Sequence, residues 1–253
     1  MGTKDFYQEI EHTPVQWRNY MLHVPLFYSD FMFISASYLA PLERIKTILP
    51  SSRLKPYRIT PWHGVVSITA YKYRKCDIGP YNEVGVGIPV TLDQPTPLFT
   101  GIIRPMPSNP FIFSHRLPVT TQIAMDVGKE FAGYPKFIAD IEFAEEENWI
   151  TCSLREDGIS IIKFSGRTID TVSSRRVTFN PITHRNGYIL RSEMILDDRD
   201  IGSSSNPDDV KLVLGEHPIS DELRELHLGR LSSYSYCPRA QGILTPVLES
   251  YAA

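Results

Sequence analysis

One lysine of this chain has surroundings that suit a nucleophile. Lys136 directly follows Pro135 at the end of an apolar segment, with Phe131, Tyr134 and Phe137 close to it in sequence. A lysine must lose its ammonium proton before it attacks a carbonyl carbon, and apolar surroundings favour the neutral amine because the charged form is costly to desolvate. That attack produces a Schiff base, whose iminium accepts electrons from a breaking neighbouring bond. The alternative is a surface lysine at a turn, since lysine is almost never fully buried.

Two short motifs contain this lysine and a glutamate upstream of it. Residues 129–136 hold an acidic residue, a short linker and then Tyr-Pro-Lys, and residues 81–90 read Tyr-Asn-Glu followed by small residues and Ile-Pro-Val. In this order the two motifs resemble the active-site signatures of the acetoacetate decarboxylase family. The similarity extends from about Phe31 to the region after Pro218, where it rests on the hydrophobic pattern.

The resemblance implies a role for each of the two residues. Lys136 would form a Schiff base with a keto acid, and Glu83 would orient the substrate or shuttle a proton near the iminium. The implied protein is a cofactor-free lyase that decarboxylates a small β-keto acid such as acetoacetate and assembles as a homo-oligomer. For Glu83 the alternative is an exposed carboxylate on a strand.

The sequence departs from the family pattern at three places. Phe137 follows the lysine where the family commonly has a second lysine, so burial has to favour the neutral amine of Lys136. Residues 27–33 contain no basic residue, although the family has an arginine there that receives the substrate carboxylate. A second glutamate of the family is replaced near Ser67 or Ile68. Such departures are typical of the divergent members of the family.

The substrate carboxylate would therefore need another partner. Arg104 and Arg116 are the nearest candidates in sequence, and for each the alternative is a solvated arginine at the end of a strand. Tyr134 and Phe137 flank the lysine and are further candidates for substrate contact, although a flanking tyrosine in a turn can instead be packed.

Two alternative functions stay open, one that uses the same lysine and one that is not catalytic. An aldolase-dehydratase acting on pyruvate-like substrates would use the same lysine. A non-catalytic relative would keep the barrel as a ligand-binding or assembly module and would have no need for a reactive lysine.

Composition favours a water-soluble enzyme with a small-molecule substrate. Of the 253 residues, 42% are hydrophobic and 22% are charged, which allows a sizeable core. The formal net charge is −3 and the charges are interspersed, so we expect no nucleic-acid partner. No apolar run reaches about 18 residues and the N-terminus has no apolar signal core, so we expect a cytoplasmic protein that does not bind membranes.

Cysteine and histidine spacing gives no sign of a metal or a disulfide framework. The three cysteines, Cys76, Cys152 and Cys237, are far apart in sequence, and we interpret them as reduced thiols. The seven histidines show no HxH or HExxH spacing, so we expect no metal site. Phosphate-binding and nucleotide-binding motifs are also absent from the sequence, and we expect no cofactor.

The elements that must position Lys136 and Glu83 are mostly strands. Alternating or β-branched segments predict strands at 26–38, 64–75, 81–92, 98–104, 110–114, 137–143, 149–155, 159–165, 177–180 and 187–196. Strands 64–75 and 81–92 form a hairpin around the turn at 77–80, which places Glu83 early in the second strand. The segment 197–209 is charged and rich in serine, and we expect a loop.

Helical spacing predicts three helices, at 41–49, at 120–132 and at 221–226. Thr120 or Thr121 would cap the second helix, and Gly133 would end it just before Lys136 enters the next strand. Consecutive strands with few helices predict a mainly β (α+β) fold with an antiparallel, barrel-like core of meandering strands and helices packed outside. We expect one domain over 1–253, with 1–25 as an N-terminal extension and 240–253 as a C-terminal tail.

Overall fold

The computed structural model describes residues 6–8, 10–97, 107–172 and 176–253. The strands are β1 Thr13–Trp17, β2 Tyr20–Val24, β3 Leu26–Pro41, β4 Leu54–Pro56, β5 His63–Cys76, β6 Tyr81–Leu92, β7 Phe111–Arg116, β8 Asp140–Glu146, β9 Trp149–Glu156, β10 Ile159–Arg167, β11 Arg176–Arg185, β12 Tyr188–Arg191, β13 Met194–Ser204, β14 Val210–Leu214, β15 Leu231–Leu244 and β16 Glu249–Ala252. The helices are α1 Leu42–Thr47, α2 Gln122–Ala132, α3 Pro218–Glu225 and the short 3₁₀ turn η1 Pro207–Asp209.

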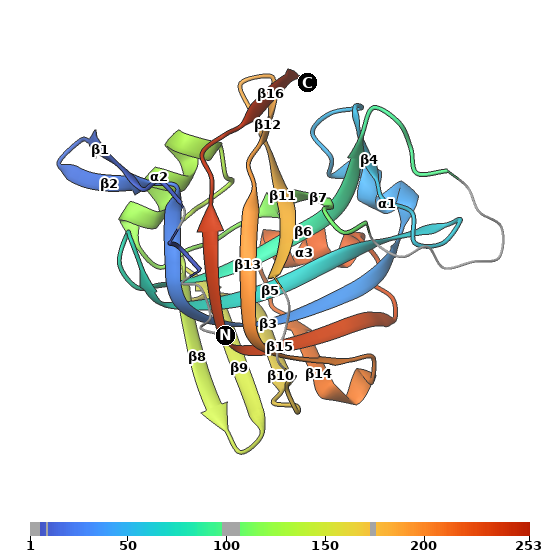
Figure 1. The fold of residues 1–253 in the computed structure, drawn as a ribbon. Coiled ribbons are helices and arrows are strands. Elements are labelled where there is room, and N and C mark those ends of the chain that lie inside the picture. Colours follow the sequence, from blue (N-terminus) through green and yellow to red (C-terminus); the bar gives the residue numbers. More distant parts are fainter. Residues whose placement is uncertain (1–5, 9, 98–106, 173–175) are drawn as a thin grey trace.

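Seven strands of the described chain close into a ring. Its order is β13, β15, β3, β5, β6, β7 and β11, and β11 pairs back onto β13. Neighbouring strands are antiparallel except β7 and β11, which are parallel. Figure 1 shows the ring with the helices on its outside. The predicted mainly β, barrel-like fold is therefore confirmed, although the ring is not a regular barrel.

A second sheet packs against one side of the ring. Its order is β14, β10, β9 and β8, and Figure 1 shows it below the ring. The core between the two contains Val66, Ile68 and Ala70 of β5 together with Cys152 and Phe164 from the second sheet. Because successive side chains of a strand point to opposite faces, the residues that alternate with this apolar set point into the ring.

The β5 and β6 residues that point into the ring are therefore those that alternate with the apolar core set. The predicted hairpin of these two strands is confirmed, with Tyr71 opposite Glu83, Thr69 opposite Gly85 and Ser67 opposite Gly87. These three pairs are the floor of the site described below.

Two segments differ from the sequence-based expectation because their partners are distant in sequence. The predicted loop at 197–209 is wrong, since β13 continues to Ser204. Its Asp200 carboxylate is within ion-pair distance of Arg239 on β15, which offsets the charge on the strand. β15 itself was not predicted. Its Pro238 lies in an irregularity between Cys237 and Ala240, a position where a strand tolerates proline.

Element boundaries shift elsewhere. β8 begins at Asp140, so Lys136 lies in an extended segment before the strand. The third helix begins earlier than predicted, at Pro218, with the His217 side chain accepting a hydrogen bond from the Ile219 N–H. The predicted strand 98–104 lies outside the described residues.

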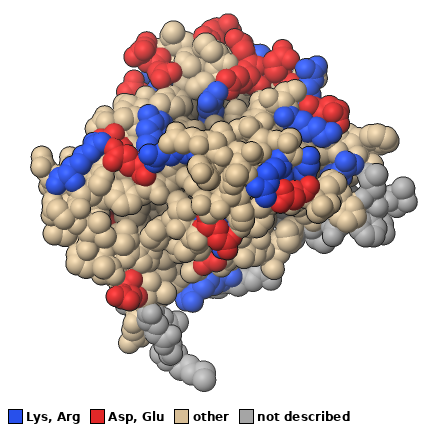
Figure 2. Space-filling view, turned by 90° about the horizontal axis from the view of Figure 1, so that it is seen from above, with Lys and Arg blue, Asp and Glu red and all other residues tan. Residues whose placement is uncertain are grey.

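The surface carries charges of both signs. On the face in Figure 2, Lys and Arg side chains lie next to Asp and Glu side chains. Several opposite charges are in contact, among them Arg191 and Glu249 at 2.8 Å. In the described part of the chain, helices long and apolar enough to cross a membrane do not occur. Nor do three His, Cys, Asp or Glu side chains of the described residues gather where they could hold a metal ion.

Candidate active site

Glu83 and the lysine segment are held side by side by a single residue between them. Val119 forms an antiparallel bridge with Glu83 on one side and a parallel bridge with Ile138 on the other. The Val119 N–H donates to the Phe137 carbonyl at 2.9 Å, and the Ala139 N–H donates to the Val119 carbonyl at 3.0 Å. Val119 therefore lies between β6 and the extended segment that carries Lys136, and it fixes that segment two strand spacings from β6.

The end of α2 directs the chain toward this position. Gly133 has φ 65°, in the left-handed region, and its N–H donates to the Lys129 carbonyl at 3.1 Å, so it ends the helix as predicted. The predicted side-chain cap at the other end of α2 is not formed. Thr121 occupies the N-cap position without a side-chain hydrogen bond, and the Thr120 hydroxyl instead accepts the Asn82 N–H at 2.9 Å.

The two candidate catalytic side chains meet in the interior. Lys136 Nζ lies 2.8 Å from Glu83 Oε2, with the side chains 6% and 7% exposed. Among the described groups none donates a well-aligned hydrogen bond to Oε2, so its contact with the ammonium is mainly electrostatic. The other carboxylate oxygen, Oε1, accepts a hydrogen bond from the Tyr73 hydroxyl at 3.3 Å. A carboxylate that close to an amine can accept its proton.

The side chain of Lys136 passes directly over the backbone of α2. A Cβ atom placed on Gly128 would lie 2.6 Å from Cδ and 2.7 Å from Cε of Lys136. Such distances are far inside van der Waals contact, so any residue larger than glycine would displace the lysine. This explains a glycine in the middle of a helix, where it is less favourable than alanine by about 1 kcal/mol.

Buried tyrosines surround the pair. The rings of Tyr81 and Tyr134 lie 5.4 Å and 5.7 Å from Lys136 Nζ. Burial raises the pKa of Tyr28, Tyr73, Tyr81 and Tyr134, and the negative charge of Glu83 raises it further. These phenols therefore stay neutral and can donate hydrogen bonds at any working pH.

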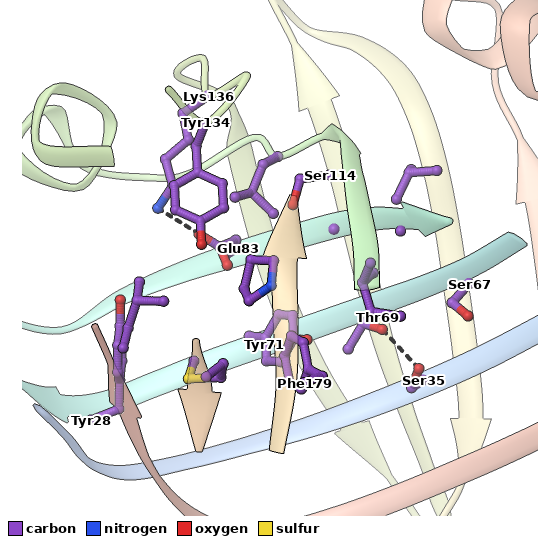
Figure 3. A pocket seen from close by; sticks show the side chains of 18 of the residues that line it. Tyr28, Ser35, Ser67, Thr69, Tyr71, Glu83, Ser114, Tyr134, Lys136 and Phe179 are labelled. Atoms are coloured by element: carbon purple, nitrogen blue, oxygen red, sulfur yellow. Dashed lines mark hydrogen bonds and ion pairs between the residues drawn. The ribbon is translucent and has the colours of Figure 1, made fainter. Parts of the chain in front are cut away.

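Lys136 and Glu83 face a cavity of about 290 Å³ inside the ring. Figure 3 shows them with Tyr134 on one side of this cavity and Thr69, Ser35 and Ser67 on the other. The Ser35 and Thr69 hydroxyls lie 2.7 Å apart. Of the described residues that line the cavity, the charged ones are Lys136 and Glu83.

The remaining sequence candidates lie in different places. Tyr134 lines the cavity. Phe137 packs against the core between the ring and the second sheet. A bulge in β7 pairs Ser114 with Gly87 but Arg116 with Val86, so Ser114 lines the cavity and Arg116 does not. Arg104 lies outside the described residues.

Arg116 is engaged on the other face of β7. Its guanidinium donates to both oxygens of Glu222 on α3, at 2.6 Å and 2.8 Å from Nη2. His115 Nε2 also lies 3.3 Å from Glu222. The only arginine candidate among the described residues is thus already bound to a carboxylate away from Lys136.

Sequence reasoning missed Gly128 and Tyr73. An isolated glycine within an amphipathic helical pattern is a recognised signal of close packing, and Gly128 could have been found that way. Tyr73 continues the alternation of Ser67, Thr69 and Tyr71 along β5, but no local signal shows that it reaches Glu83.

Comparison with known proteins gives a family and a fold. The family model described as acetoacetate decarboxylase (ADC) matches residues 10–241. No curated protein is similar enough in sequence to count as a match.

Several solved structures share the fold at low sequence identity. Acetoacetate decarboxylase from Legionella pneumophila subsp. pneumophila str. Philadelphia 1 has a TM-score of 0.64 and 16% identity, over 90% of this chain and 88% of that one. The enduracididine biosynthesis enzyme MppR, complexed with pyruvate, has a TM-score of 0.65 and 12% identity, over 95% and 98%. An acetoacetate decarboxylase-like enzyme from Sphingomonas wittichii RW1 has a TM-score of 0.56 and 12% identity, over 90% and 93%.

The two sequence motifs, the ring with Lys136 and Glu83 in its interior, and a family model that matches most of the sequence agree with one another. This chain belongs to the acetoacetate decarboxylase family.

Proposed function

We propose that this protein is a lyase that forms a Schiff base between Lys136 and the carbonyl carbon of a β-keto acid and then releases CO₂. The observation that carries the proposal is the buried contact between Lys136 and Glu83 at the wall of a cavity. A buried ammonium and carboxylate are costly to keep out of water, so a pair of this kind is expected where the proton between them is used.

In the proposed steps, Glu83 is the group that accepts and donates protons beside Lys136. The ammonium proton of Lys136 passes to Glu83, the amine attacks the carbonyl carbon, and loss of water gives an iminium. The bond to the carboxylate then breaks, its electron pair moves into the iminium to form an enamine, and CO₂ leaves. Glu83 has returned its proton to the departing water, so it takes a new proton from solvent and passes it to the enamine carbon. Water then hydrolyses the iminium to release the ketone and the free lysine.

An aldolase-dehydratase is the second candidate, because the same lysine would also form an enamine from pyruvate, which would then attack an aldehyde. The fold similarity to MppR complexed with pyruvate and the missing arginine in residues 27–33 favour testing it. A non-catalytic ligand-binding protein is the third possibility, and it predicts no covalent adduct. Within the proposal, the protein needs no cofactor and assembles in the cytoplasm as a single-domain homo-oligomer, as its family resemblance implies.

The test is reductive trapping. The protein is incubated with acetoacetate or with pyruvate, borohydride is added, and the intact mass is compared with that of Lys136→Gln. Glutamine can still donate a hydrogen bond to Glu83 but cannot form a Schiff base. Lys129→Gln is the matched control, since Lys129 is exposed near the end of α2.

We expect an adduct in the wild type and in Lys129→Gln and none in Lys136→Gln. The mass gained shows whether the trapped species is decarboxylated acetoacetate or intact pyruvate. An adduct that persists in Lys136→Gln, or no adduct with any keto acid, contradicts the proposal.

A further inference from the structure

The cavity extends well beyond the two candidate catalytic side chains. Its floor is made by Glu83, Gly85 and Gly87 of β6, which point to the same face of the strand. At about 3.3 Å per residue, the distance from Glu83 to Gly87 is about 13 Å. Lys136 and Glu83 therefore lie at one end of an elongated space, as Figure 3 shows.

Two glycines keep this space open. A Cβ atom on Gly87 would lie 3.0 Å from Cγ2 of Ile112, and one on Gly85 would lie 3.2 Å from Cδ1 of Leu117. Glycine weakens the interior of a strand, so its presence at two alternate positions indicates a site where something approaches the backbone closely. Here the two positions line the cavity and face no core residue of the second sheet.

The end distant from Lys136 is lined by neutral hydroxyl groups. Ser67, Thr69 and Ser35 lie there on β5 and β3, and Ser114 of β7 is opposite Gly87. Each hydroxyl has one donor and two acceptor positions, so the Ser35–Thr69 contact leaves capacity for a ligand. Lys136 and Glu83 are the charged residues of the described lining, and both belong to the other end.

We propose that the substrate is an extended β-keto acid, whose chain beyond the reacting carbonyl is uncharged and carries hydroxyl or carbonyl oxygens. The inference rests on the proposed Schiff-base function of Lys136. The reacting carbonyl lies at Lys136, the chain follows Gly85 and Gly87, and its oxygens meet the hydroxyls of β3, β5 and β7. A charged chain end is disfavoured because the described lining has no cation at the end distant from Lys136 to compensate its desolvation.

Three probes separate length from charge. They are acetoacetate, β-keto-octanoate with a terminal hydroxyl and β-keto-octanoate with a terminal carboxylate, each assayed for CO₂ release. We expect kcat/KM for the hydroxyl-terminated probe to exceed that for acetoacetate by about tenfold or more, since each added methylene is buried. The carboxylate-terminated probe should be about tenfold or more worse than the hydroxyl-terminated one.

Variants at the distant end test the assigned path. Gly87→Val fills the cavity beside Ile112, and Ser67→Ala removes a hydroxyl without adding volume. Both should lower the ratio of kcat/KM between the hydroxyl-terminated probe and acetoacetate, Gly87→Val more strongly. Ser233→Ala, on the exposed side of β15, is the matched control and should leave the ratio unchanged. Equal kcat/KM for all three probes, or a ratio that Gly87→Val and Ser67→Ala do not alter, overturns the inference.

A binding measurement separates this inference from the proposed function. Calorimetry with the hydroxyl-terminated probe is done on Lys136→Gln, where no Schiff base forms, and on Lys136→Gln combined with Gly87→Val. We expect binding to the first that is weakened at least tenfold in the second. If the wild type traps no keto acid, the proposed Schiff-base function is wrong. In that case, probe binding to Lys136→Gln that is lost when Gly87→Val is added still supports an extended ligand. The inference of an extended ligand is overturned if the probe does not bind to Lys136→Gln, or if it binds equally to the two variants.

Discussion

Lys136 Nζ lies 2.8 Å from Glu83 Oε2, and Val119 is the residue whose backbone links the two chain segments. The contact joins two motifs that are far apart in sequence. Because both side chains are buried, each group is the main electrostatic partner of the other, and neither can be removed without consequence for the second.

Replacing the Glu83 carboxylate should slow Schiff-base formation more than it weakens substrate binding. In Glu83→Gln the amide cannot accept the ammonium proton of Lys136, so we expect the single-turnover rate of Schiff-base formation to fall about 100-fold or more. The measurement is borohydride trapping at timed intervals. Glu130→Gln, at an exposed position on α2, is the control and should keep the wild-type rate. An unchanged rate in Glu83→Gln would assign the proton transfer to another group.

A methyl group on Gly128 should remove activity without unfolding the protein. Alanine is the better helix former by about 1 kcal/mol, but its Cβ would lie 2.6 Å from Lys136 Cδ and would push the lysine away from Glu83. We expect Gly128→Ala to keep its circular dichroism spectrum and to trap acetoacetate at least tenfold more slowly. Gln122→Ala, on the exposed side of the same helix, is the control. Wild-type trapping by Gly128→Ala would show that the lysine path over α2 is not needed.

The Tyr73 hydroxyl should matter through Glu83. It donates to Oε1 at 3.3 Å, and burial together with the charge of Glu83 raises the pKa of Tyr73 well above its ordinary value. We expect Tyr73→Phe to lower kcat several-fold with little change in KM, because the carboxylate loses a hydrogen bond that holds it beside Lys136. The measurement is steady-state CO₂ release, with kcat and KM determined separately.

Tyr81→Phe is the matched control for that experiment, since the Tyr81 hydroxyl donates to Tyr28 at 3.5 Å and not to Glu83. An equal fall of kcat in both variants would mean that the tyrosines act by packing alone.

The extent to which the sequence predicts this structure depends on how local each feature is. The hairpin of β5 and β6 and the end of α2 at Gly133 follow from alternation and from one turn residue, and both were predicted. β15 has serines and Pro238 in its sequence, and its pairing with β3 and β13 is decided by segments distant in the chain. A local pattern contains no information about such partners.

The same distinction applies to the site. The motifs identified Lys136 and Glu83 as candidates, and the structure places their side chains in contact. The environment of the pair was not predictable, because Gly128 and Tyr73 act through tertiary contacts. The bulge in β7 that turns Arg116 toward Glu222 is likewise set by the pairing of β6 with β7.

The contact of Arg116 with Glu222 predicts a pH-dependent contribution to stability. Partial burial raises the pKa of Glu222, but the hydrogen bonds and charge of Arg116 outweigh it, and the net pKa lies below the ordinary value of 4.5. A carboxyl group whose pKa is lowered on folding stabilises the protein above its unfolded pKa, and this contribution is lost as the pH falls through the folded pKa. Because Glu222 is partly exposed, we expect about 1 kcal/mol after solvent screening.

The measurement is urea unfolding of the protein and of Glu222→Gln at pH 7 and near pH 3. Both proteins also carry the substitution His115→Gln, because His115 contacts Glu222 and would itself change protonation over this pH range. Glu222→Gln should be less stable at pH 7, and the difference should shrink as the carboxyl of the parent becomes protonated. A difference that stays constant over this range would mean that Glu222 contributes through packing, since a contribution from its charge must disappear when the charge does.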